Sequence, residues 1–478
     1  MIVTIDGSGL DRAALVRVAR GGTEVELAAD VTGRMRASRE VVERALDAGA
    51  AVYGLSTGVG VLKRVELSED GAAYSHAVLR THRVAQGPIA PAALVRGTML
   101  RLLNAYADGT TGVRPELALR LLRALNEGEV PPVRTLGSVG QADLAPMADL
   151  AMGLFADVDL AAGEGLALVS SNAFSTAWAT LAIEDADGLL DTLAIAGSLS
   201  LEGLGANRSL FHPAIGDVRP YPGLVTALRR IGELLEGSWL LEPGAARSLQ
   251  DPLVFRNLPH LLGAGLDALT FADAQLSVEL NASQSNPVVV PGEPRPISVA
   301  NYEILPLVTA LDHLRITLAS VVGASAERSV KLLEAPWSGL ATGLAVGGPS
   351  DPGLGYLGIA VQGLAAEARL LAAPVSFEVV STSHAEGLED RATMAPLAAR
   401  RLAEQVELGR RVAAIELAVA AQAVDLRGRR PLGAGTTLAH AIVREYVPGL
   451  EAGDTVPDME PLVERLGRRL LPLGGEGT

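Results

Sequence analysis

The chain has no cysteine among its 478 residues, and only 3% of it is aromatic. Without cysteine there is no disulfide, no thiolate nucleophile and no cysteine-bound metal. Strand-forming residues occur only in short runs, which argues against a β-sandwich or a barrel. Alanine and leucine, which both favour helices, dominate instead. The composition therefore predicts a mainly helical protein with a large apolar core.

Positive charge is also scarce, because 40 lysines and arginines stand against 55 aspartates and glutamates, for a net charge of -15. Nucleic acids and anionic membranes bind basic surfaces, so we expect neither as a partner, and a small-molecule substrate instead. The first residues lack the basic and apolar regions of a signal peptide. The uncharged stretch at residues 165–183 contains several Ser and Thr residues, and we interpret it as a buried core helix with its entry loop. A cytoplasmic protein is expected.

Short alternating patterns open the chain, and helical periodicity follows. MIVTI and TEVEL have the composition of strands and flank a helical stretch, which predicts a small N-terminal α+β cap at residues 1–51. Residues 52–427 are predicted to form one central helical domain with the active-site loops, and residues 428–478 a C-terminal helical tail. A helix from Pro115 to Gly128 has both terminal signals. Further helices are expected at residues 94–106, 190–205, 259–282, 303–333, 355–372 and 393–424.

The common nucleotide-binding and metal-binding motifs provide little evidence of function in this sequence. GLGYLG at residues 353–358 has the spacing of a dinucleotide loop, but it follows GGPSDP rather than a strand. His76 and His82 are six residues apart, which does not place them on one helical face, and no H-E-x-x-H motif supports a metal. We therefore expect no metal site.

Four segments combine polar residues with turn chemistry in this otherwise apolar chain. Each has a structural explanation of its own, but together they suggest a polar pocket within a helical bundle. In the second of them, Asp143 stands at a plausible helix N-cap and Pro146 in the first turn. The segments are YGLSTGVG (53–60), GSVGQADLAP (137–146), LQDPLVFR (249–256) and GLED (387–390).

In this order the segments resemble the aromatic amino acid lyase family, which includes the histidine and phenylalanine ammonia-lyases and related aminomutases. ELNASQSNP, SVANYE and AEGLED resemble further segments of that family, and the similarity covers essentially the whole chain. The resemblance implies an all-α fold, an ammonia-lyase-like bundle of long near-parallel helices. It also implies a homotetramer whose active sites combine loops from more than one subunit.

The family's reagent is an electrophilic ring, methylidene-imidazolone, which forms when an Ala-Ser-Gly tripeptide between GSVG and DLAP cyclises and its serine loses water. Here only Gln141 and Ala142 stand between GSVG and Asp143, so there is no serine to dehydrate and no glycine nitrogen to attack. Ser138 precedes the turn and is followed by Val139, so it cannot substitute. We therefore expect a degenerate electrophile loop and no cofactor.

The resemblance assigns roles to the other pocket residues. Where the family has an asparagine beside the ring, this chain has Ser170, with Asn172 two residues on, and where the family has a second tyrosine it has Leu253. Tyr53 and Glu389 are the predicted catalytic residues, of which Glu389 acts as a second acid or base or orients an amine. The implied substrate-binding residues are Arg256, Gln250, Tyr302, Asn172, Ser170 and His76.

Ammonia elimination without the ring looks difficult, because one general base supplies only about 10²–10⁴-fold. The leading hypothesis is therefore a cofactor-free acid/base enzyme of specialised biosynthesis. It would catalyse addition, elimination, cyclisation or isomerisation of a preactivated small molecule with an unsaturated or β-substituted carbonyl. The alternatives are an inactive homologue that serves as a ligand-binding or partner scaffold and, ranked last, a conventional histidine or aromatic ammonia-lyase.

In that hypothesis Tyr53 exchanges a proton once nearby positive charge lowers its pKa from about 10. The helix that begins near Asp143 faces a developing oxyanion, and Arg256 holds a carboxylate. Structural roles stay open for the same residues. Tyr53 would then anchor its loop, Arg256 and Glu389 would join a buried ion pair, and Asp143 would only cap its helix, which is the role we favour for it.

Overall fold

The computed structural model of the chain describes residues 2–67, 71–377, 384–471 and 473. It is 61% helix and 4% strand, which confirms the predicted helical class. The chain divides into two compact units: unit 1 is Met1–Glu184, Ala272–Leu311 and Pro374–Arg400, and unit 2 is Asp185–Phe271, Asp312–Ala373 and Arg401–Thr478. The division into a cap, a central domain and a tail stays a prediction. The helices that contribute residues to both units are α8 (Ala173–Leu204), α12 (Leu258–Glu279), α13 (Leu305–Leu333) and α16 (Ala395–Arg427).

Unit 1 opens with the strands and helix expected of the N-terminal cap. Strands β1 (Ile2–Ile5) and β2 (Glu24–Leu27) pair in parallel, and α1 (Arg12–Gly21) connects them. The Asp11 carboxylate accepts a hydrogen bond from the backbone N–H of Ala14 at 2.6 Å, which caps α1. The other helices of unit 1 are α2 (Val31–Asp47), α3 (Gly71–His82), α4 (Ala92–Asp108), α5 (Pro115–Glu127), α6 (Leu144–Phe155) and α7 (Glu164–Val169), with the short turns η1 (Gly60–Leu62) and η5 (His384–Gly387).

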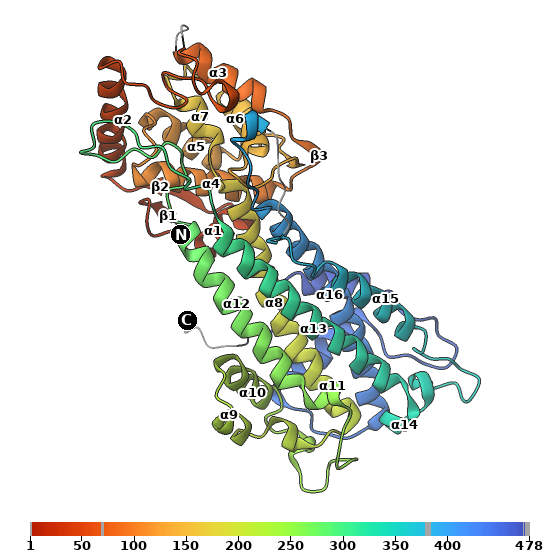
Figure 1. Ribbon diagram of the computed structural model, residues 1–478. Coiled ribbons are helices and arrows are strands. Elements are labelled where there is room, and N and C mark those ends of the chain that lie inside the picture. The colour runs from red at the N-terminus through yellow and green to blue at the C-terminus, as the bar shows by residue number, and fades with distance from the viewer. Residues whose placement is uncertain (1, 68–70, 378–383, 472, 474–478) are drawn as a thin grey trace. The chain divides into compact units, whose positions relative to one another are not determined.

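Within unit 1, α4 packs against α1, α2 and α5, and α3 packs against α6 and α7 (Figure 1). A second small sheet, formed by β3 (Gln86–Ile89) and β4 (Arg134–Leu136), is not predicted by the sequence. Its first strand contains glycine and proline and lacks alternating apolar residues, so it gives no strand signal.

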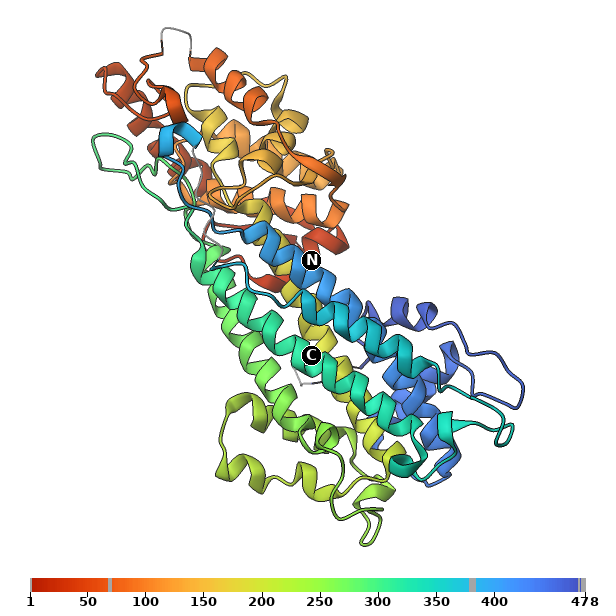
Figure 2. The same ribbon diagram turned by 45° about the vertical axis from the view of Figure 1, so that its right-hand side comes forward.

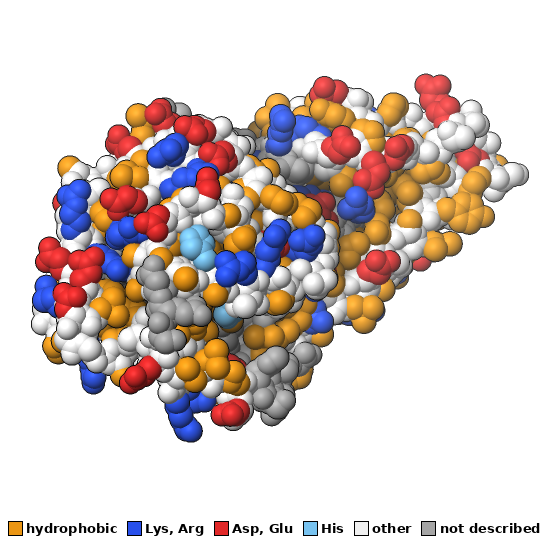
Figure 3. Space-filling model, turned by 90° about the horizontal axis from the view of Figure 1, so that it is seen from above, with side chains coloured by type: hydrophobic (Ala, Val, Ile, Leu, Met, Phe, Trp, Pro, Cys, Tyr) orange, Lys and Arg blue, Asp and Glu red, His pale blue; other side chains and the backbone are white. Residues whose placement is uncertain are grey.

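On the face shown in Figure 3, basic and acidic side chains are interspersed among apolar ones.

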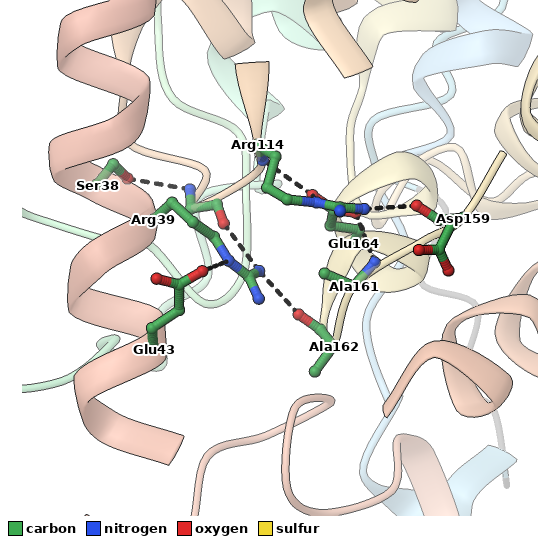
Figure 4. A network of polar contacts seen from close by, with 9 residues as sticks. Ser38, Arg39, Glu43, Arg114, Asp159, Ala161, Ala162 and Glu164 are labelled. Atoms are coloured by element: carbon green, nitrogen blue, oxygen red, sulfur yellow. Dashed lines mark hydrogen bonds and ion pairs between the residues drawn. The ribbon is translucent and has the colours of Figure 1, made fainter. Parts of the chain in front are cut away.

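An ion pair with one buried partner fixes the start of α7. Glu164 is fully buried, and Arg114 binds it through Nε at 3.0 Å and Nη2 at 2.8 Å (Figure 4). The backbone N–H of Ala161 donates to the same carboxylate at 2.7 Å. Arg39 of α2 donates to the carbonyl of Ala162 at 3.0 Å. These bonds tie α2, α7 and the residues before α5 into one rigid platform.

Unit 2 is built around parts of α8, α12, α13 and α16, which run side by side in both ribbon views (Figures 1 and 2). Its centre is polar: Arg328 donates to Glu416 at 2.6 Å and 2.8 Å, and both are buried. Ser200 also donates to this carboxylate, at 2.8 Å. The remaining elements are α9 (Ala214–Val218), α10 (Pro222–Leu234), α11 (Leu253–Arg256), α14 (Ala335–Ser338), α15 (Leu357–Leu370), α17 (Ala434–Tyr446) and α18 (Glu460–Leu466), with the turns η2 (Arg208–Phe211), η3 (Trp239–Leu241) and η4 (Thr342–Leu344).

Two helical stretches of the described residues are long and apolar enough to cross a membrane, by length and composition alone: Glu164–Leu204 and Leu305–Leu333. In the first, 89% of the most apolar window is buried inside the protein. That degree of burial is typical of a core helix, which is the interpretation that the sequence favours for residues 165–183.

Candidate active site

The tyrosine loop of unit 1, residues 53–60, is held by two phenols, one of its own and one from α3. The backbone N–H of Gly60 donates to the Tyr53 hydroxyl at 3.0 Å, and the neighbouring N–H of Val59 donates to the Tyr74 hydroxyl at 2.9 Å. Gly54 has a left-handed φ of 71°, and any Cβ there would collide with Leu166 of α7. The tyrosine loop therefore packs against α7, whose start is fixed by the hydrogen bonds to Glu164.

Tyr53, Tyr302 and Glu389 share one electrostatic environment. Burial raises the pKa of Tyr53, and the Glu389 carboxylate adds to the rise. Burial likewise raises the pKa of Tyr302, with further contributions from Glu389 and from Tyr53. The expectation that positive charge lowers the pKa of Tyr53 is therefore wrong, because burial and a carboxylate act in the opposite direction. Both phenols are protonated at neutral pH.

The segment that carries Glu389 is fastened on both sides. Before it, Lys63 of the tyrosine loop pairs with Glu386 at 3.9 Å. After it, Arg391 Nε donates to Glu303 Oε2 at 3.2 Å. Three stretches that are distant in sequence thus meet around Glu389 in unit 1.

The loop at residues 137–143 is bonded tightly into the same unit. The carbonyl of Gly140 accepts from Asn172 Nδ2 at 2.9 Å and from Thr393 Oγ1 at 2.8 Å. Gly140 has a left-handed φ of 81°, and a Cβ there would collide with Thr393. The next residue, Gln141, donates from Nε2 to Glu303 Oε2 at 3.0 Å. Gln141 and Arg391 therefore share one carboxylate oxygen.

The Asp143 side chain bonds to serines on both sides of it in space instead of capping its helix. It stands at the N-cap position of α6, but its side chain makes no cap bond there, so the favoured structural role is wrong in its detail. The buried carboxylate instead accepts from the backbone N–H of Ser175 at 2.7 Å, from Ser175 Oγ at 2.8 Å and from Ser138 Oγ at 3.0 Å. It ties the loop to the start of α8. Burial raises its pKa to about 6.

This shift predicts how stability depends on pH. The unfolded pKa of aspartate is about 3.9, so the folded protein binds the Asp143 proton more readily than the unfolded chain does. The wild type should gain stability relative to Asp143→Asn as the pH falls from about 7 to about 4. The melting temperatures of both proteins across this range measure the effect, and a difference that does not change with pH would contradict it.

The residues of this loop do not fit the family's ring. Between Gly140 and Asp143 there is no hydroxyl to lose, and Ala142 is buried with a left-handed φ of 54°. The carbonyl of Gly140 already accepts two hydrogen bonds, and the N–H of Asp143 donates to the carbonyl of Ser171 at 2.8 Å.

The other predicted residues are divided between the units. Ser170 is buried where α7 ends, and His76 is half-buried on α3, both in unit 1. Gln250 and Arg256 belong to unit 2. There Gln250 is exposed, and Arg256 Nε donates to the carbonyl of Asp251 at 2.8 Å.

Sequence reasoning missed Glu303, Arg391 and Thr393. The first two stand close to residues that it selected, since Glu303 follows Tyr302 and Arg391 comes two residues after Glu389. The only available signal was the presence of charge in those polar segments. Glu303 and Arg391 are 88 residues apart in the sequence, so local spacing cannot reveal that they pair.

The helical fold is that of the ammonia-lyases. A crystal structure of histidine ammonia-lyase from Trypanosoma cruzi matches with a TM-score of 0.88 and 25% identity, over 98% of this chain and 93% of that one. The ergothioneine-degrading enzyme ergothionase from Treponema denticola matches with a TM-score of 0.91 and 27% identity, over 98% of both chains.

The chain belongs to the aromatic amino acid lyase family, whose model matches residues 10–157 and 155–445. The histidine ammonia-lyase of Symbiobacterium thermophilum is 34% identical over 96% of this chain and 95% of its own length. These findings overturn the leading hypothesis, in which the enzyme acts on preactivated carbonyl compounds rather than as an ammonia-lyase. Relatives named histidine ammonia-lyase match nearly the whole chain, so the ammonia-lyase activity that we ranked last is favoured instead.

Proposed function

We propose that this chain is an amine-eliminating lyase that acts on an α-amino acid with a planar ring, of which histidine is the first candidate. The observation that carries the proposal is the cluster of Tyr53, Tyr302 and Glu389 in unit 1. Two protonated phenols beside a carboxylate supply both an acid and a base. The names of the relatives point to the same reaction class.

The reaction breaks the Cα–N bond and one Cβ–H bond and forms a Cα=Cβ bond. Glu389 is the proposed base that takes the β-proton while ammonia departs from Cα. Tyr53, which burial keeps protonated, gives its proton to the departing ammonia to form ammonium. The proton on Glu389 then returns to the Tyr53 phenolate. The products are an α,β-unsaturated acid and ammonium, and both side chains recover their starting forms.

Histidine is the first candidate because of its ring. An imidazole attached to Cβ withdraws electrons, most strongly when protonated, and so makes the β-proton more acidic. The base then has a smaller barrier to overcome. A general base contributes about 10²–10⁴-fold to the rate.

The proposal is tested by incubating the protein with L-histidine, L-phenylalanine and L-tyrosine and following the absorbance of the unsaturated acid. Glu389→Gln should lower the rate by about 10²–10⁴-fold. Glu386→Gln is the matched control, because it removes a carboxylate three residues away that fastens the same segment through Lys63, at 3.9 Å, but takes no part in the proposed proton transfer. It should lower the rate much less than Glu389→Gln does. Equal losses in both variants would contradict the role of Glu389.

We further propose that the loop does not form the family's ring. Cyclisation and dehydration each release one water, so a ring-bearing chain is lighter than its sequence. Gln141 and Ala142 offer neither the hydroxyl nor the glycine nitrogen. Intact-mass spectrometry should give the mass of the unmodified sequence, and a deficit of two waters would contradict the proposal.

We also propose a homotetramer, as the family resemblance implies. Support comes from α15, where Ile359 and Leu370 are 72% and 77% exposed, because large apolar side chains so exposed often mark an interface between chains. Light scattering at micromolar concentration should report four subunits, and a stable monomer would contradict the proposal. The cytoplasmic location and a biosynthetic role stay predictions.

A further inference from the structure

The Glu303 carboxylate joins three stretches of unit 1 that are distant in sequence. Its Oε2 accepts from Gln141 Nε2, in the loop before α6, at 3.0 Å, and from Arg391 Nε at 3.2 Å. Its Oε1 accepts from the backbone N–H of Leu305, the first residue of α13, at 3.1 Å. One side chain thus connects the loop before α6, the start of α13 and the segment at residues 385–394.

The segment at residues 385–394, which contains the proposed base, also bonds directly to the loop before α6. Thr393 Oγ1 donates to the carbonyl of Gly140 at 2.8 Å, and the N–H of Met394 donates to the carbonyl of Val139 at 2.9 Å. The end of the segment is therefore aligned with the loop, and the shared carboxylate adds a further link closer to the base.

Both stretches contain strained backbone. A left-handed φ is unfavourable for residues other than glycine, and it persists only where surrounding contacts hold it. The described part of the chain has five such residues, and four of them lie in these two stretches: Ala142 at 54°, Ala385 at 52°, Glu386 at 60° and Met394 at 58°. Strain of this kind collects at functional sites. Because strained residues lie both before and after Glu389, its position depends on the contacts that hold the segment.

We propose that Glu303 is a positioning residue, which acts through Arg391 to hold Glu389 at the distance from the substrate that proton transfer requires. Glu303 directly follows Tyr302, so the same carboxylate also fixes the chain that carries this phenol. A displacement of about 1 Å at a reacting group can lower a rate by about 10²-fold. This inference rests on the proposed function and deepens it, since it names the residue that aligns the proposed base.

Glu303→Gln tests the inference. The amide has one acceptor oxygen and no charge, so it cannot keep all three bonds. With L-histidine, kcat should fall by about 10–10²-fold, while KM should change by less than about threefold. The kinetic isotope effect on kcat with β-deuterated L-histidine should rise, because a misplaced base makes transfer of the β-proton limit turnover. A mere loss of folded enzyme would lower kcat without raising the isotope effect.

Glu129→Gln is the matched control. Glu129 is 39% exposed and Glu303 is 33% exposed, and each accepts from an arginine within unit 1. Arg120 of α5 donates to Glu129 at 3.0 Å and 2.7 Å. This variant should keep the kcat, the KM and the isotope effect of the wild type. Thermal melting verifies that each variant is folded.

Arg391→Met tests the path through which Glu303 acts. It should lower kcat as Glu303→Gln does, and the double variant should lose little more than either single one, because the two residues act as a unit. Arg391→Lys keeps the positive charge and should retain more activity than Arg391→Met. If Glu303→Gln does not fold, Arg391→Met decides by the same measurements.

Each outcome decides the inference. It is overturned if Glu303→Gln keeps kcat within about threefold of the wild type, if kcat falls without a rise in the isotope effect, or if the losses of the two single variants multiply in the double one. An equal loss in Glu129→Gln overturns it as well. If the wild type makes product while any of this happens, the proposed function stands and only the inference fails. If the wild type makes no product from any of the three amino acids, both fail together.

Discussion

Arg328→Met is expected to lower the free energy of unfolding by about 3–5 kcal/mol, because it leaves the Glu416 carboxylate buried without its counter-charge. Arg328 is 1% exposed and Glu416 is fully buried, and their atoms approach to 2.6 Å and 2.8 Å. Methionine has similar length and no charge. Urea unfolding followed by circular dichroism measures the loss.

Two further variants show whether the unpaired Glu416 carboxylate causes the loss of stability. The double variant Arg328→Met/Glu416→Leu removes both charges and should recover most of the lost stability. Lys331→Met lies one turn further along α13. It breaks a partly exposed pair with Glu334 at 3.2 Å and a cation–π contact with Trp337 at 5.6 Å, so it should cost less than about 2 kcal/mol. A double variant as unstable as the single one would show that the unpaired carboxylate is not the cause.

Tyr53→Phe is expected to lower the turnover of the amino-acid substrate by about 10²–10⁴-fold with little change in binding. Phenylalanine keeps the packing of the ring in the tyrosine loop but removes the proton that the reaction passes to ammonia. Steady-state kinetics should show the loss in kcat rather than in KM.

Tyr74→Phe separates proton transfer from loop anchoring. The hydroxyls of Tyr53 and Tyr74 accept from adjacent backbone N–H groups, those of Gly60 and Val59, at 3.0 Å and 2.9 Å. If anchoring were the only role, both variants would lose activity alike. We expect Tyr74→Phe to keep kcat within a few-fold of the wild type, and equal losses would assign Tyr53 to loop structure alone.

Much of the fold is predictable from local signals. Pro115 begins α5 and Gly128 ends it in a left-handed conformation, as the sequence pattern indicates. The strands at the N-terminus lie where alternation places them. The β3–β4 pair is missed because a strand that contains glycine and proline owes its pairing to tertiary contacts rather than to propensity.

The site is harder to predict, because its bonds span long stretches of chain. Gln141 meets Glu303 across 162 residues, and Asp143 meets Ser175 across 32. The direction of the Tyr53 pKa shift depends on burial, which no motif encodes. The functional hypothesis failed for a related reason, since it gave one altered loop more weight than the rest of a chain whose relatives are named histidine ammonia-lyase.

The central claim, that this protein eliminates an amine from a ring-bearing amino acid, is tested most directly by measuring ammonium and unsaturated acid together during incubation with L-histidine. The account predicts that both appear in equal amounts and that both are lost in Glu389→Gln. Ammonium without the unsaturated acid would indicate a different reaction. Neither product from histidine, phenylalanine or tyrosine would contradict the claim.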